Sequence, residues 1–137
     1  MQLVWEKFTY DTLEDAKRQC FCLYVFHHPQ DGDRPFYIGK AKSFGTSQSS
    51  GYTASARYNS GYMHLIAGML RSDFSLYIAH IGEAAFKDVE AYEQELIYQW
   101  GSVRKQKIKP NRKSVTTVKP WATSDSLLNA MPKSDMP

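Results

Sequence analysis

The chain lacks long apolar runs and has few cysteines. None of its 137 residues belongs to a continuous stretch of about 20 apolar residues, and the N-terminal residues lack the apolar core of a secretion signal. In an extended strand, Cys20 and Cys22 would point to the same face in positions unsuited to a disulfide, and no second cysteine pair completes a zinc site. We therefore expect a cytoplasmic protein with reduced thiols and no membrane partner.

A strong net charge is also absent. The 17 Lys and Arg residues exceed the 14 Asp and Glu residues by three, so the total charge permits a polyanionic partner without requiring one. The distribution is more informative, because six basic residues lie close together: Arg104, Lys105, Lys107, Lys109, Arg112 and Lys113. This basic cluster can neutralise phosphates, although a solvated loop would have the same composition.

The apolar pattern predicts a small α+β domain. Compact apolar runs indicate strands, and helical spacing of apolar residues indicates helices. A turn-rich segment separates the first two strands and predicts a hairpin. The predicted strands are 21–26, 36–39 and 74–81, and the predicted helices are 12–19, 60–71 and 84–100. This order favours a three-stranded, largely antiparallel sheet flanked by helices.

The composition also divides the chain into three parts. Residues 1–20 form an N-terminal segment with a short helix, and residues 21–113 form the main domain. Residues 114–137 contain prolines and small polar residues, so we expect a tail that is partly disordered or packed on the domain. Within the main domain, residues 43–55 are rich in Ser, Thr and Gly and predict an exposed loop.

One carboxylate lies on the apolar face of the last predicted helix. Glu93 follows Val89 by four residues and precedes Ile97 by four, so it shares their face at about 3.6 residues per turn. An ionised carboxylate in apolar surroundings costs several kcal/mol without compensation. A divalent metal or an arginine would compensate it, and a hydrated position at the rim is the third alternative. Hard oxygen ligands favour Mg²⁺ or Mn²⁺ and leave the choice between them open.

Two short motifs resemble the GIY-YIG endonuclease family. The second strand carries Tyr37-Ile38-Gly39 followed by Lys40, which matches the second tripeptide of the family. The first strand carries Cys22-Leu23-Tyr24, which keeps the tyrosine but lacks the leading Gly-Ile. The resemblance implies that Glu93 is the metal-binding glutamate of the last helix, and that Asn111 is the asparagine that follows this helix. It covers about residues 21–112.

The resemblance also implies an arginine in the helix after the hairpin. Arg57 is the best match, but Gly61 stands where many members have a His or Tyr one helical turn later. His64, Tyr62 and Tyr58 are the available substitutes, and the sequence does not choose among them. We favour His64, since an imidazole can transfer protons near neutral pH.

By resemblance, the chain is expected to be a metal-dependent endonuclease, a phosphodiester hydrolase acting on DNA. Glu93 would hold the metal, Arg57 would neutralise developing charge, and Tyr24 would help to activate water. Tyr37 would orient water or phosphate, and it lies close to Tyr24 if the hairpin register allows. The remaining expected contacts to DNA are made by Lys40, Lys42, Tyr58, Tyr62 and Asn111.

Two other functions compete with this one. The missing Gly-Ile and the displaced histidine are compatible with a catalytically inactive nucleic-acid-binding module of the same fold. An interaction domain unrelated to nucleic acid is the third alternative. The sequence leaves open whether the nucleic acid is DNA or RNA and which sites it contains.

Overall fold

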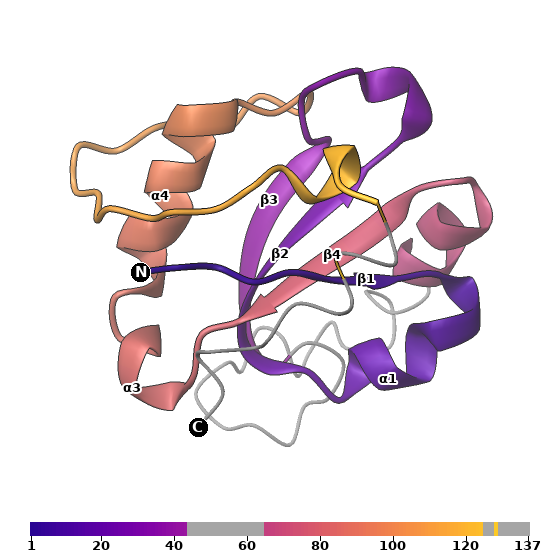
Figure 1. The fold of residues 1–137 in the computed structure, drawn as a ribbon, viewed down its shortest axis with the longest axis horizontal. Helices are drawn as coiled ribbons and strands as arrows, with labels where there is room; N and C mark the ends of the chain where they lie inside the picture. The colour runs from indigo at the N-terminus through magenta and orange to yellow at the C-terminus, as the bar shows by residue number, and fades with distance from the viewer. Residues whose placement is uncertain (44–64, 125–127, 129–137) are drawn as a thin grey trace.

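The computed structural model describes residues 1–43, 65–124 and 128, and this part of the chain is an α+β fold (Figure 1). Four antiparallel strands form one sheet in the order β1-β4-β2-β3. The strands are β1 (Glu6–Phe8), β2 (Cys20–His27), β3 (Tyr37–Ser43) and β4 (Ser75–His80). Strand β2 therefore lies inside the sheet, and β3 lies at one end of it.

Helices cover both faces of this sheet. The named helices are α1 (Leu13–Lys17), α3 (Glu83–Phe86) and α4 (Val89–Trp100), and residues 65–71 are also helical. Short 3-10 turns occur at Tyr10–Thr12, Pro29–Asp31 and Pro120–Ala122. Within the described ranges, no helix is long and apolar enough to cross a membrane.

The alternation of side chains along β2 produces two apolar layers. Leu23 and Val25 are buried on the face that α4 covers, together with Leu96 and Ile97. On the opposite face, Cys22, Tyr24 and Phe26 pack with Ile66 and Leu70 from helix 65–71 and with Ala16 from α1. Because helices cover both faces, the five consecutive residues 22–26 of β2 are all buried.

The two ends of the described chain complete the α4 layer. Leu3 and Trp5 are buried in it, and Gln2 forms a parallel bridge with Thr116. In Figure 1 the N-terminal segment and the segment after α4 run beside each other across the molecule. Residues on both sides of the predicted main domain therefore contribute to its core.

The sequence predicted the hairpin, the third strand and the antiparallel sheet, and these are confirmed. Three strands were the wrong number, because β1 pairs with β4. The predicted strand 36–39 is too short, since β3 continues to Ser43. The start of the predicted helix 60–71 and nearly all of the predicted loop 43–55 lie outside the described residues.

The predicted helix 84–100 is broken into α3 and α4. Asp88 is the N-cap of α4 with a non-helical backbone, and its carboxylate meets the Lys113 amine at 3.2 Å. Asp is a poor helix former in a helix interior and a favourable residue at a helix start. The break lets Phe86 pack edge-on against Phe21, with ring centroids 5.5 Å apart, while α4 covers the sheet.

Candidate active site around strand β3

The Tyr-Ile-Gly-Lys motif forms the first half of β3, at the end of the sheet. In the hairpin register, Tyr37 stands opposite Phe26 and Gly39 opposite Tyr24, so these positions share the face covered by helix 65–71. Ile38 and Lys40 point to the other face, toward α4. The motif therefore contributes side chains to both faces of the sheet.

The ring of Tyr24 lies directly over Gly39. A Cβ atom added to Gly39 would lie 2.3 Å from Cζ and 2.5 Å from the hydroxyl oxygen of Tyr24. Any other residue at position 39 would displace the ring, which is itself buried. Packing against the Tyr24 ring thus explains why a glycine occupies this strand position.

The two tyrosines that the sequence selected are neighbours. The ring centroids of Tyr24 and Tyr37 are 6.3 Å apart, with the planes tilted by 41°. This agrees with the expected register, in which both tyrosines occupy one face of the hairpin.

Glu93 is buried, as its place on the apolar face of α4 predicted. The residue is 6% exposed, which rules out the hydrated rim position. A cation faces it, because Lys40 donates a hydrogen bond from Nζ to Glu93 Oε1 at 3.1 Å. The sequence did not single out this lysine as the partner of Glu93. The metal alternative stays a prediction, and Arg57, the arginine expected in the site, lies outside the described residues.

Burial controls the ionisation of Glu93. Loss of hydration raises the pKa of its carboxyl above the ordinary value, and the charge and hydrogen bond of Lys40 oppose this shift. Neighbouring Glu90 raises the pKa further. Glu93 is therefore a carboxylate whose negative charge is incompletely compensated inside the protein.

The donor set at Glu93 fits a hard divalent ion with few protein ligands. Lys40 occupies Oε1, and Oε2 accepts no hydrogen bond from the described part of the chain. No cluster of three or more His, Cys, Asp or Glu residues occurs in the same ranges. Mg²⁺ is commonly bound through one or two carboxylates together with water and substrate phosphate, so a single carboxylate oxygen is compatible with it.

The four other sequence candidates from the helix after the hairpin are not placed. Arg57, Tyr58, Tyr62 and His64 all lie outside the described residues. Glu93 makes no hydrogen bond to Tyr24 or Tyr37, from which the β3 strand separates it. The structure thus forms two pairs, Tyr24 with Tyr37 and Lys40 with Glu93, on opposite faces of one strand.

The remaining two candidates occupy exposed or partly exposed positions. Lys42 lies on the same side of β3 as Lys40 and forms no ion pair with a described residue. Asn111 is exposed in the segment that returns along α4.

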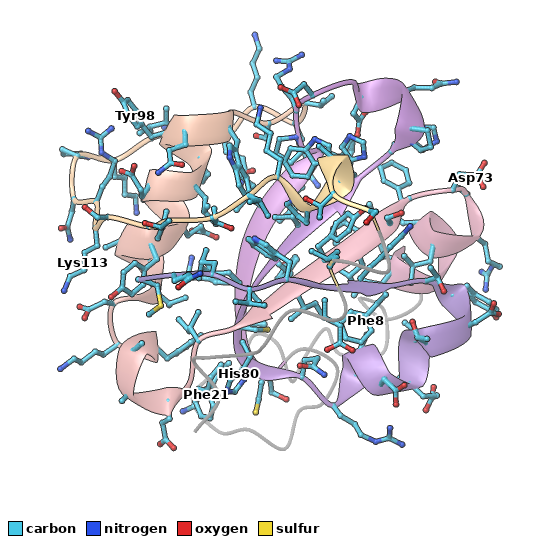
Figure 2. All side chains as sticks on the ribbon, viewed as in Figure 1. Phe8, Phe21, Asp73, His80, Tyr98 and Lys113 are labelled. Atoms are coloured by element: carbon cyan, nitrogen blue, oxygen red, sulfur yellow. The ribbon has the colours of Figure 1, made fainter. Side chains whose placement is uncertain are left out.

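The basic cluster divides into two halves. Lys109, Arg112 and Lys113 form ion pairs with Glu90, Glu95 and Asp88, respectively. Figure 2 shows Tyr98 and Lys113 on the outer side of α4, away from the sheet. Their positive charges are therefore largely balanced by the carboxylates of α4 and of the turn before it.

The other half of the cluster lies near β3. The guanidinium carbon of Arg104 is 5.6 Å from the ring centroid of Tyr37, and Arg104 and Lys105 are exposed. The Arg104 backbone amide donates to Phe36 O at 3.0 Å, which fixes this segment beside the strand. Sequence reasoning placed Arg104 in the cluster but did not identify it as the arginine next to a candidate tyrosine.

Gln106 holds the same segment on the outer edge of β3. Its side-chain oxygen accepts from Ile38 N at 2.9 Å, and its side-chain nitrogen donates to Ile38 O at 2.8 Å. The amide group thus satisfies the two backbone groups that a further strand would satisfy. No pattern in the sequence distinguishes Gln106 from an ordinary surface residue.

In comparisons with known proteins, no family model, characterised protein or solved structure matches this chain.

Proposed function

We propose that this chain is a metal-dependent endonuclease of the GIY-YIG type that hydrolyses phosphodiester bonds of DNA. The observation that supports this proposal most is the buried ion pair between Glu93 and Lys40. Lys40 follows Gly39 in β3, the glycine on which the Tyr24 ring packs. An incompletely compensated carboxylate costs stability, and such groups concentrate at functional sites. The Tyr-Ile-Gly-Lys motif of β3 supplies one member of each pair, Tyr37 beside Tyr24 and Lys40 beside Glu93.

Each residue has a part that fits phosphodiester hydrolysis. The second oxygen of Glu93 would hold Mg²⁺ or Mn²⁺, and such an ion would relieve charge on the phosphate and lower the pKa of water. Lys40 would neutralise a phosphate oxygen. Tyr24 would accept a proton from the attacking water as the phenolate, because the neutral phenol has no basic site for it, and the Tyr37 hydroxyl would orient the phosphate.

An inactive DNA-binding module is the second candidate, and one observation favours it. Lys40 already occupies one oxygen of Glu93, so a cation faces this carboxylate without a metal. A chain that had lost catalysis would keep the basic residues near β3 and the ion pair as structure. The two candidates differ in whether bound DNA is cut.

Cleavage of plasmid and labelled oligonucleotides, with and without Mg²⁺, separates the candidates. We expect cutting that requires the metal and falls at least about 100-fold in Glu93→Gln, the scale found when a group that stabilises transition-state charge is removed. Glu90→Gln is the matched control, because Glu90 lies on the same helix but is exposed and paired with Lys109. DNA binding without cutting at any metal concentration supports the module, and equal activity of both variants refutes the role of Glu93.

A further inference from the structure

A pocket opens beside the two tyrosines. Its volume is about 350 Å³, and five of the nine described residues that line it are aromatic, among them Tyr24, Tyr37, Phe36 and Phe74. The helix 65–71 supplies the aliphatic wall, which includes Met69. This volume is at the lower end of the range for small-molecule sites, of about 300–1,000 Å³, so the pocket holds one compact group.

Arg104 is the charged residue among the described residues that line this pocket. Arg104 is exposed and approaches the face of Tyr37, and it forms no ion pair within residues 1–43, 65–124 and 128. Arg112 offers a direct contrast, since its guanidinium stacks on Tyr98 at 3.8 Å from the ring centroid and also pairs with Glu95. The Arg104 charge therefore remains available to an anion at the pocket.

The lining of the pocket therefore fits a flat apolar group with a negative charge attached at the pocket mouth, near Arg104. An uncharged aliphatic ligand would pack on the aliphatic wall but would make no ionic contact with Arg104. A nucleobase stacks on aromatic side chains regardless of its identity, and its own phosphate lies within reach of a cation beside the ring. Two exposed lysines, Lys105 and Lys107, follow Arg104 in the chain. They extend the positive charge that can face the phosphate backbone of a nucleic acid.

We infer that this pocket receives one unstacked nucleobase, with Arg104 on the adjacent phosphate. The inference rests on the proposed function, which identifies the bound polymer as DNA. It adds the class of substrate, which is a nucleic acid with an unpaired nucleotide near the cut. A base inside a duplex cannot enter without being unstacked, which costs a few kcal/mol and least where it is already unpaired. Bulged, gapped or single-stranded DNA is therefore the preferred ligand.

Binding without divalent metal tests this inference independently of cleavage. Three labelled duplexes are compared by fluorescence anisotropy: fully paired, with a one-nucleotide bulge, and with the same bulge lacking its base. Base stacking of about 1–3 kcal/mol corresponds to a preference of roughly 5- to 150-fold for the bulge with its base over the abasic bulge. The abasic duplex keeps the phosphate charge and the bend, so this comparison isolates the base.

Two variants locate the binding site. Met69→Trp fills the pocket, and we expect it to lose the preference for the base while its affinity for the abasic duplex stays unchanged. Phe74→Leu removes an aromatic wall residue without filling the pocket and lowers the same preference, which keeps the test valid if Met69→Trp fails to fold. Arg104→Gln weakens binding of both bulged duplexes more than Arg112→Gln, which removes the same charge from a guanidinium stacked on Tyr98.

Equal affinity of the wild-type protein for the two bulged duplexes overturns the inference, whether or not the protein cuts DNA. A base preference that Met69→Trp and Phe74→Leu both leave intact also overturns it, because the base then binds elsewhere. A base preference in a protein that never cuts supports the inference and refutes only the proposed hydrolysis.

Discussion

Replacing Lys40 by methionine leaves the buried Glu93 carboxylate without its cation. The Lys40 side chain is 31% exposed and that of Glu93 8% exposed, so the pair lies between a surface and a buried ion pair. Surface pairs contribute about 0–1 kcal/mol, and breaking a buried pair costs about 3–5 kcal/mol. We therefore expect Lys40→Met to lower the free energy of unfolding by about 2–3 kcal/mol at neutral pH.

The pH dependence of this loss identifies its cause. Burial raises the pKa of Glu93 in the folded protein above its unfolded value, so the protein loses stability as the pH rises from the unfolded pKa through the folded pKa. Removing Lys40 raises the folded pKa further. The loss should vanish below about pH 4, where Glu is protonated in both states, and grow to its full size as the pH rises through the folded pKa.

Urea denaturation of the wild type and the variant between about pH 4 and pH 8 measures this difference. With a slope of roughly 2 kcal/mol per molar urea, the midpoint should fall by about 1–1.5 M at neutral pH. Lys42→Met is the control, because Lys42 lies two positions along the same strand without a described ion pair. Lys40→Met combined with Glu93→Gln should recover most of the stability, since no buried charge remains. A loss that is independent of pH, or equal in Lys42→Met, refutes the reasoning.

Two further predictions concern the neighbours of the pair. Gly39→Ala should lower the free energy of unfolding by about 1–3 kcal/mol in denaturation experiments, because the added methyl group overpacks against the Tyr24 ring. This loss should disappear when Tyr24 is also changed to Ala. An equal loss with the ring absent would contradict the packing argument. Gln106→Ala should lose about 1–2 kcal/mol, at about 1 kcal/mol for each of its two hydrogen bonds to Ile38. Hydrogen exchange at the Ile38 amide should become faster in this variant, and unchanged exchange would show that the edge of β3 is protected by other groups.

The sequence predicted those features that depend on local periodicity. The burial of Glu93 follows from its spacing to Val89 and Ile97, and the hairpin follows from two apolar runs around a turn. Strand β1 was missed because three residues are too few for alternation, and only Phe8 among them is buried. The break at Asp88 was missed because good helix formers surround it on both sides.

The partner of Glu93 could not be predicted from local patterns. Lys40 meets Glu93 only because α4 packs on the face of the sheet toward which Ile38 also points, and this is a property of the topology. The same holds for Arg104, whose place beside Tyr37 depends on how the chain returns after α4. The sequence therefore indicates the residue types of the proposed site but not how they pair.

The end position of β3 in the sheet is what allows the proposed site to work. Gly39 and Lys40 are adjacent, yet alternation directs the tyrosines to one face and Lys40 with Glu93 to the other. In an interior strand, hydrogen-bonded neighbours on both sides would keep these groups apart. At the end of the described sheet, a phosphate can approach the edge of β3 and meet groups from both faces. Gln106 covers the edge at Ile38, so the approach must be made beyond it, where Lys40 and Lys42 supply positive charge.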